Sequence, residues 1–226
     1  MRHVTDKLFS LCVPVIVLLV LTGCQTISGN GKQKNKVMLF NGQDLAGWKV
    51  YIPDEGIAQN DVWSVKDGVI YCSGIPNGYM RTLEEYGNYK LHLEWRWVAK
   101  PANSGVLVHA TGPDQLWPKC IECQLMAGSA GYMVLMNGTG ITIDGQDKQN
   151  PNERFVIIAK KQHSTEKPAG QWNSYDIVCR ADTISAYVNG VLQNEGTNAT
   201  RTSGWIALQS EGGPIEFRNI YLEMLD

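Results

Sequence analysis

A short apolar run near the middle of the chain carries one carboxylate and one amide. The run is CIECQLM, from Cys120 to Met126, and strand alternation places Glu122 and Gln124 on one face. A carboxylate among apolar neighbours has the environment of a general acid, a general base or a metal ligand. A structural carboxylate paired with an arginine or lysine across a sheet is the alternative. We predict that Glu122 is a catalytic acid or base.

His109 is the second candidate for proton transfer. It ends the run NSGVLVH, in which alternation places Gly105, Leu107 and His109 on one face. The near-neutral pKa of imidazole suits acid–base catalysis, although a lone strand histidine is also a common structural hydrogen-bonding group. A divalent cation bound by Glu122, His109 and Glu94 is a further alternative that the sequence does not require.

The two cysteines beside Glu122 do not predict a zinc or redox site. Only one Cys-x-x-Cys pair is present, Cys120 and Cys123, whereas structural zinc needs a second pair of ligands. In a strand these two side chains point to opposite faces, so they cannot readily pair with each other. Together with Cys72 and Cys179 they allow three disulfide pairings, and the sequence does not choose between these pairings and free thiols.

The run NYKLHLEWRWV predicts a strand over residues 88–98 with two different faces. Tyr89 and Trp97 belong to an aromatic and apolar face, and His92, Glu94 and Arg96 belong to a polar one. A salt-bridged exterior is one explanation. Because residues 104–110 and 119–126 also present polar side chains, we expect the three strands to form one concave, ligand-lined sheet.

The rest of the chain repeats the same pattern of short alternating runs separated by turn residues. Asp67-Gly68 and Asn189-Gly190 are hairpin turns. No long helical pattern occurs, so we predict an all-β fold, a two-sheet antiparallel sandwich of the jelly-roll type. A break in alternation near Asn219 predicts a β-bulge. We expect the core to contain Trp48, Trp63, Trp95, Trp172 and Trp205, and we expect further strands at 131–136, 154–161, 172–180, 184–188, 204–210 and 214–222.

The N-terminus predicts export and lipid anchoring. Arg2 and Lys7 precede an apolar run that ends in Leu21-Thr22-Gly23-Cys24, the form of a bacterial lipobox. We predict a lipoprotein signal peptide over 1–23, a lipidated Cys24, a flexible tether over 24–36 and one domain over 37–226. An ordinary signal peptide with a chance cysteine is the alternative. The predicted location is the cell envelope, on the outer membrane or facing the periplasm.

The overall charge argues against one class of partner. The formal net charge is −2, and no basic cluster occurs. Nucleic acid is therefore not an expected partner.

Several runs, taken in order, resemble the 3-keto-disaccharide hydrolase domain family. They are LFNGQDLAGWKVY, DGVI, NSGVLVH, IECQLM, WNSYDIVC, YVNGVLQN and IALQSEGGPIEFRNIYL, and the resemblance extends from about Val37 to Leu225. The resemblance implies a concanavalin-like or glucanase-like jelly roll whose concave face binds a sugar oxidised to a ketone at carbon 3. It also implies cleavage by elimination or hydrolysis: a base removes the C2 proton and an acid protonates the departing oxygen.

The residues around Glu122 bear on the type of glycoside cleavage. Retaining glycosidases of this sheet type commonly carry Glu-x-Asp-x-x-Glu, but here Gln124 and Ala127 replace the second and third acids. Double displacement is therefore disfavoured, whereas elimination through one base remains open. A non-catalytic carbohydrate-binding module on the same fold is the alternative from another class.

The resemblance also suggests which side chains would hold the sugar. Glu94 and Arg96 would bind the keto-sugar oxygens, Asn103 and Ser104 would hydrogen-bond hydroxyls, and Trp117 would stack on a ring or cap the core. The complete set of predicted substrate-binding residues is Glu94, Arg96, Asn103, Ser104, Trp117, Gln124, Gln209, Glu211 and Arg218.

Overall fold

The computed structural model describes residue 1 and residues 35–226. The predicted signal peptide, Cys24 and nearly all of the predicted tether lie outside the described residues. Among the residues that are described, no helix is long and apolar enough to cross a membrane.

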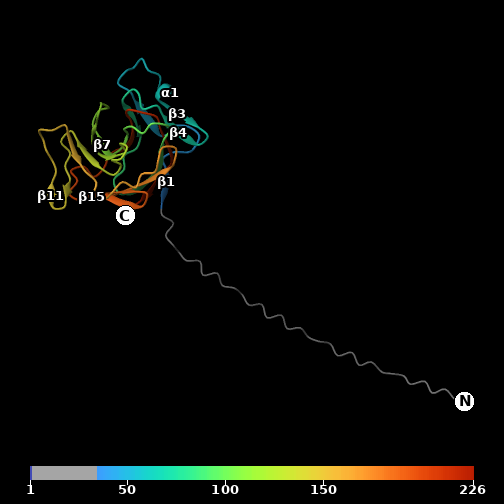
Figure 1. The fold of residues 1–226 in the computed structure, drawn as a ribbon. Helices are drawn as coiled ribbons and strands as arrows, with labels where there is room; N and C mark the ends of the chain where they lie inside the picture. The colour runs from blue at the N-terminus through green and yellow to red at the C-terminus, as the bar shows by residue number, and fades with distance from the viewer. Residues whose placement is uncertain (2–34) are drawn as a thin grey trace. The chain divides into compact units, whose positions relative to one another are not determined.

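Two large antiparallel sheets make up the described domain (Figure 1). In sheet A the strands run in the order β15-β14-β13-β6-β17-β4-β3, and β1 pairs with β17. Their bounds are β1 Lys36–Met38, β3 Trp63–Lys66, β4 Val69–Cys72, β6 Tyr89–Trp97, β13 Asn173–Arg180, β14 Thr183–Val188, β15 Val191–Gly196 and β17 Ile215–Met224.

Sheet B has the order β12-β9-β8-β7-β16-β5-β2. Its strands are β2 Trp48–Tyr51, β5 Gly78–Thr82, β7 Gly105–Thr111, β8 Lys119–Gln124, β9 Met133–Met136, β12 Phe155–Ile158 and β16 Trp205–Ser210. A short pair, β10 Thr142–Ile143 and β11 Gln146–Asp147, and one turn of helix, α1 Gln59–Val62, complete the described elements. The predicted all-β two-sheet sandwich is confirmed.

The main core lies between the two sheets and follows from strand alternation. Along β6, alternate residues from Tyr89 to Trp97 are buried, as the sequence predicted. They pack in one cluster with Val106, Val108 and Ile121 of sheet B. Trp48, Trp63 and Trp95 belong to this core, but Trp172 and Trp205 are only partly buried and do not.

A second apolar cluster covers the opposite, outer face of sheet B. It contains Tyr79, Leu107, Ala110, Trp117, Cys120, Val134, Met136 and Ala207. These residues alternate along their strands with residues of the main core, which places them on the other side of the sheet. Trp205 packs against this cluster, so the expectation that it fills the main core is wrong.

The expectation that the three polar strands share one sheet is also wrong. β7 and β8 are neighbours in sheet B, but β6 lies in sheet A between β13 and β17. Alternation predicts the two faces of a regular strand such as β6 correctly, yet it carries no information about which strands pair. The predicted bulge near Asn219 is confirmed: the β17–β6 register shifts between Arg218 and Tyr221, and Asn219 has a φ of 53°.

Candidate functional site

Glu122 lies on the outer face of sheet B, between two apolar residues of the adjacent strands. The strand registers place it opposite Leu107 of β7 and Val134 of β9. It is 2 % exposed, and its Oε1 has no hydrogen-bond partner. Burial removes this carboxyl from water and so favours its neutral form. No hydrogen-bond donor to Oε1 offsets that effect.

The Glu122 carboxyl occupies space that is free because Gly105 has no side chain. A Cβ atom at position 105 would overlap this carboxyl, whose Cδ would be 2.7 Å away. Gln124 pairs with Gly105 on one side, and the β16–β7 register, continued by one residue, brings Gln209 opposite Gly105 on the other. The carboxyl thus lies over a glycine that is flanked by two glutamines.

Glu211 lies two residues beyond Gln209 on the same side of the chain. Asn103 forms a β-bridge with Glu211, and its side chain also hydrogen-bonds the Glu211 carboxylate. The side-chain oxygens of Gln209 and Asn103 are, like Glu122 Oε1, buried without a hydrogen-bond partner. Two amide oxygens without donors therefore lie near the two carboxyls, and one oxygen of the Glu122 carboxyl also lacks a donor.

The two carboxyls affect each other's protonation. Burial, with a smaller contribution from the charge of Glu211, raises the pKa of Glu122 to about 8. Burial also raises the pKa of Glu211, while the hydrogen bond from Asn103 acts in the opposite direction. Neither carboxylate has an ion-pair partner among the described residues. Burial therefore favours the neutral form of both carboxyls.

The remaining predicted glutamine and serine have structural hydrogen bonds. Gln124 Oε1 accepts hydrogen bonds from the backbone N–H groups of Leu125 and Met126, each at 3.0 Å. Ser104 is fully buried, and its hydroxyl donates to the Gln209 carbonyl at 2.8 Å. Ser104 therefore supports the strand that carries Gln209 and does not present its hydroxyl at the surface.

A loop over residues 112–118 extends across the outer face of sheet B. Its Asp114 carboxylate accepts hydrogen bonds from Tyr79 Oη at 2.9 Å and Arg81 Nε at 2.9 Å, and it contacts Lys49 Nζ at 2.7 Å. These basic groups and the tyrosine hydroxyl lower the pKa of Asp114 to about 2 against the effect of burial. Asp114 therefore fastens the loop to β5 and β2.

Trp117, on the same loop, packs against the apolar cluster on the outer face of sheet B. It is 8 % exposed and packs in the apolar cluster with Leu107, Cys120 and Val134, which are the neighbours of Glu122. The loop is also held by Asn137, whose side-chain amide donates to the Trp117 carbonyl at 2.8 Å. In this conformation Trp117 caps an apolar cluster, which is one of its two predicted roles.

His109 does not share the face of Glu122, contrary to the prediction. The β7–β8 register shifts between Val108 and Thr111, and His109 has a φ of 52°. This bulge turns the imidazole towards Tyr89 of sheet A, with ring centroids 5.7 Å apart. Its ring nitrogens lie 3.0 Å from the Arg201 carbonyl and 3.3 Å from the Gly87 carbonyl, and burial lowers its pKa. His109 thus has the surroundings of a structural histidine.

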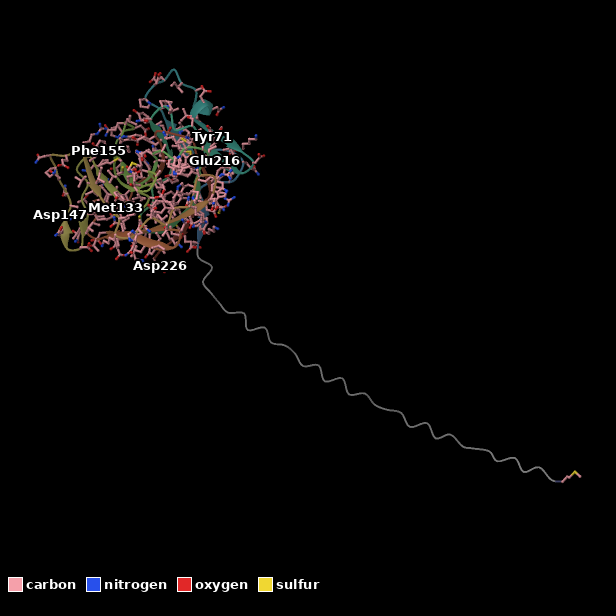
Figure 2. The ribbon with its side chains drawn as sticks, in the orientation of Figure 1. Tyr71, Met133, Asp147, Phe155, Glu216 and Asp226 are labelled. Atoms are coloured by element: carbon pink, nitrogen blue, oxygen red, sulfur yellow. The ribbon has the colours of Figure 1, made fainter. Side chains whose placement is uncertain are left out.

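Glu94, Arg96 and Arg218 lie on the outer face of sheet A, so the structure does not bring them to Glu122. Arg218 Nε contacts Glu94 Oε2 at 2.6 Å, and Arg96 Nε contacts Glu216 Oε2 at 2.5 Å. Both guanidinium groups lie over the Trp172 ring, at 4.0 and 4.6 Å from its centroid. These contacts correspond to the salt-bridged exterior that the sequence left as an alternative. Figure 2 labels Glu216 and Tyr71, which are register partners on β17 and β4.

The set Glu122, His109 and Glu94 cannot form one metal site in this fold. One side chain lies outside sheet B, one lies between the sheets, and one lies outside sheet A. No group of three or more His, Cys, Asp or Glu side chains placed to hold a metal ion occurs within residues 35–226.

The cysteines of the domain are buried free thiols: Cys72, Cys120, Cys123 and Cys179. Cys120 belongs to the outer cluster of sheet B and Cys123 to the main core, as the prediction of opposite faces requires.

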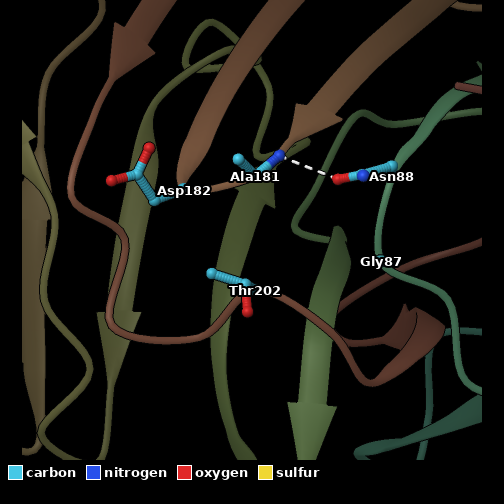
Figure 3. A pocket seen from close by; sticks show the side chains of 5 residues that line it. All are labelled: Gly87, Asn88, Ala181, Asp182 and Thr202. Carbon is cyan, nitrogen blue, oxygen red and sulfur yellow. Dashed lines mark hydrogen bonds between the residues drawn. The ribbon is translucent and has the colours of Figure 1, made fainter. Parts of the chain in front are cut away.

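A cavity of about 600 Å³ opens elsewhere in the domain (Figure 3). Gly87, Asn88, Ala181, Asp182 and Thr202 line it, and the Asn88 side-chain oxygen accepts the Ala181 N–H at 2.8 Å. Asp182 is the one ionisable side chain in this lining. None of the residues around Glu122 lines this cavity.

The sequence did not reveal the Asp114 cluster. Tyr79, Arg81, Lys49 and Asp114 come from three separate segments, and nothing in their local patterns distinguishes them from an ordinary strand face or turn. The Pro-bounded loop around Trp117 was the one signal that pointed to this region. Only the pairing order of β7, β16, β5 and β2 brings the four side chains together.

The fold and site together define a class: a two-sheet jelly-roll sandwich of the glucanase type, with acidic groups on the outer face of one sheet. The chain belongs to the family described as the 3-keto-alpha-glucoside-1,2-lyase-like domain, whose model matches residues 35–223. This is a carbohydrate-active, glycosyl-hydrolase-like family, and the family predicted from the sequence is confirmed.

Individual relatives agree with this assignment. The chain is 23 % identical over 232 residues to the 3-keto-disaccharide hydrolase of Bacteroides thetaiotaomicron, covering 84 % of this chain and 78 % of that protein. A glycosyl-hydrolase-like protein of Parabacteroides distasonis has a similar structure, with a TM-score of 0.63 and 21 % identity over 85 % of this chain and 95 % of that one. The β-glucanase of Bacillus licheniformis shares the fold, with a TM-score of 0.55 and 15 % identity over 84 % of this chain and 96 % of that one.

Proposed function

We propose that this chain cleaves the glycosidic bond of 3-keto-glycosides, including 3-keto-disaccharides, on the outer face of sheet B. The description of the family and the name of the Bacteroides thetaiotaomicron relative support this substrate class. The observation that carries the proposal is the Glu122 carboxyl, which is buried, lacks a partner for Oε1 and has a pKa raised to about 8.

The chemistry follows from the ketone at carbon 3. The ketone acidifies the hydrogen on C2, because the carbanion left by its removal is delocalised onto the ketone oxygen. The group on C1 is β to that carbanion and leaves as its oxygen is protonated. The reaction therefore requires one group that accepts a proton and one that donates a proton, and Glu211 and Glu122 are two carboxyls that can do so. Addition of water to the C1–C2 double bond would complete a net hydrolysis.

The test compares the purified protein on a 3-keto-disaccharide and on its unoxidised parent. Sugar release from the 3-keto compound alone is the expected result. Release from neither, with binding retained, would favour a carbohydrate-binding module on this fold. Release from the parent would favour a conventional glycosidase.

Substitution of single glutamates tests whether activity depends on Glu122 or on a glutamate elsewhere on the surface. Glu122→Gln should lower kcat by about 10²–10⁴-fold, the usual contribution of one acid–base group, with the fold retained. Glu216→Gln, on the outer face of sheet A, is the matched control and should leave the rate unchanged. Equal rates for Glu122→Gln and the unsubstituted protein would remove Glu122 from the mechanism.

We further propose that the protein is a lipoprotein anchored at Cys24 in the cell envelope, on the outer membrane or facing the periplasm. The basic start, the apolar run and the Leu-Thr-Gly-Cys sequence support this. Acyl chains contribute about 0.8 kcal/mol per buried methylene, so several chains bind a bilayer stably. Fractionation of cells that express Cys24→Ser should show loss of the protein from the membrane fraction. Its retention there would contradict lipidation at Cys24.

A further inference from the structure

We infer that Glu211 is a second catalytic carboxylate and that the two acids carry out different proton transfers. Glu211 removes the C2 proton, and Glu122 protonates the departing oxygen on C1. This inference rests on the proposed action on 3-keto-glycosides and assigns the proton transfers of that reaction to particular side chains.

The positions of the two side chains carry the first step of the argument. The Glu122 carboxyl lies over Gly105, which the register places opposite Gln209. Glu211 lies two residues farther along the same side, a distance of about 7 Å between Cα atoms in a strand. The two carboxyls therefore serve neighbouring points on one face, as the C2 hydrogen and the C1 oxygen of one sugar require.

The surroundings of the two groups differ in the direction that the roles demand. Glu122 is 2 % exposed and has no donor to Oε1, so its neutral, proton-carrying form is favoured. Glu211 is half-buried: burial raises its pKa as well, but a hydrogen bond from Asn103, which favours the anion, acts against this increase. Two carboxyls whose surroundings separate their proton affinities are the usual arrangement of an acid with a base.

The orphan acceptor oxygens indicate what the site lacks. Glu122 Oε1, Gln209 Oε1 and Asn103 Oδ1 are buried without hydrogen-bond donors. A sugar supplies hydroxyl donors, so its binding would satisfy oxygens that folding leaves unpaired. Trp117, on the loop over residues 112–118, belongs to the same apolar cluster as Leu107 and Val134, the strand neighbours of Glu122.

The reaction balances with these two groups alone. The C2 proton passes to the Glu211 carboxylate, and the electrons of the C–H bond form the enolate of the C3 ketone. The enolate then collapses: the ketone re-forms, a C1–C2 double bond forms, and the C1–O bond breaks while the leaving oxygen takes the proton of Glu122. Glu211 is now protonated and Glu122 ionised. One proton transfer from Glu211 to Glu122 restores the starting state.

Leaving-group dependence tests the division of roles. The substrates are a 3-keto-disaccharide, whose leaving sugar needs an acid, and a 4-nitrophenyl 3-keto-glucoside, whose phenolate leaves without one. Glu122→Gln should lose about 10²–10⁴-fold on the disaccharide and less than about tenfold on the nitrophenyl compound. Glu211→Gln should lose about 10²–10⁴-fold on both. Glu216→Gln is the control, and circular dichroism checks that each variant is folded.

Hydrogen exchange at C2 tests the base separately. A 3-keto sugar with no leaving group on C1 should exchange its C2 hydrogen with deuterated solvent in the presence of the unsubstituted protein or Glu122→Gln. It should not do so with Glu211→Gln. Equal losses of Glu122→Gln on both leaving groups, or exchange catalysed by Glu211→Gln, would overturn the assignment. Failure of the unsubstituted protein on every 3-keto-glycoside would instead contradict the proposed function.

Discussion

Glu122 shows how much one residue's behaviour depends on what its neighbours lack. An apolar strand on each side, a glycine underneath and the absence of a donor to Oε1 make ionisation costly, and the nearby Glu211 adds repulsion. The same residue type at Glu94 or Glu216 meets an arginine and forms an ordinary surface ion pair. The difference lies in the surroundings, since the side chains are identical.

This protonation should make stability depend on pH through Glu122. Its pKa is raised from 4.5 to about 8 in the folded state, so between these values the folded protein binds a proton that the unfolded chain has released. The contribution is fully present below pH about 4.5 and is lost as the pH rises towards about 8. Relative to Glu122→Gln, the unsubstituted protein should lose on the order of a few kcal/mol between pH 5 and pH 9.

Urea unfolding of both proteins at the two pH values measures this difference. Glu216→Gln is the control and should follow the unsubstituted protein, because its side chain is paired at the surface of sheet A. Parallel pH curves for the unsubstituted protein and Glu122→Gln would show that Glu122 is ionised at pH 5.

At the scale of elements, the loop over residues 112–118 and the bulge in β7 shape the outer face of sheet B. The bulge between Val108 and Thr111 turns His109 inward and lets Ala110 join the outer cluster. The loop that follows carries Asp114 to β5 and β2, whereas Trp117 on the same loop is held by Asn137, which follows β9. The bulge therefore turns His109 away from the outer face of sheet B. The loop that follows it places Trp117 in the apolar cluster beside Glu122.

Asp114→Asn should loosen that loop without unfolding the domain. The substitution removes the charge that Arg81 and Lys49 contact, and a hydrogen bond to a charged group contributes about 1.5–3 kcal/mol. Hydrogen exchange followed by mass spectrometry should show faster exchange in residues 112–118. Asp176→Asn, which breaks comparable contacts with Lys90 and His92 on sheet A, should leave that loop unchanged. Unchanged exchange in Asp114→Asn would mean that the packing of Trp117 and the Asn137 hydrogen bond hold the loop without Asp114.

At the scale of the whole domain, two sheets share one core and present two different outer faces. Sheet A exposes a network of paired charges around Trp172, whereas sheet B carries a buried apolar cluster, the Asp114 contacts and the two unpaired acids. The charged side chains on the outer face of sheet A are neutralised by ion pairs within the protein. Glu122 and Glu211 on sheet B have no ion-pair partner among the described residues. A ligand could therefore supply hydrogen-bond partners on the outer face of sheet B that the protein itself does not supply.

The packing of this domain should also protect its thiols. Cys72, Cys120, Cys123 and Cys179 are buried, and burial raises the pKa of each thiol, so little reactive thiolate is available. Iodoacetamide should label them only in denaturant, with the labelled peptides identified by mass spectrometry. Labelling at the same rate in native buffer would show that the domain opens locally around them.

The sequence alone determined the all-β sandwich, the two faces of regular strands such as β6, the bulge near Asn219 and the family, and it singled out Glu122 as an acid among apolar residues. All of these depend on local alternation and short motifs. Only the tertiary structure decided that β6 lies in the other sheet from Glu122, that His109 turns inward, that Glu211 lies near Glu122, and that Asp114 fastens the neighbouring loop. Those outcomes depend on pairing between segments far apart in the chain, and alternation along a single strand contains no information about its partners.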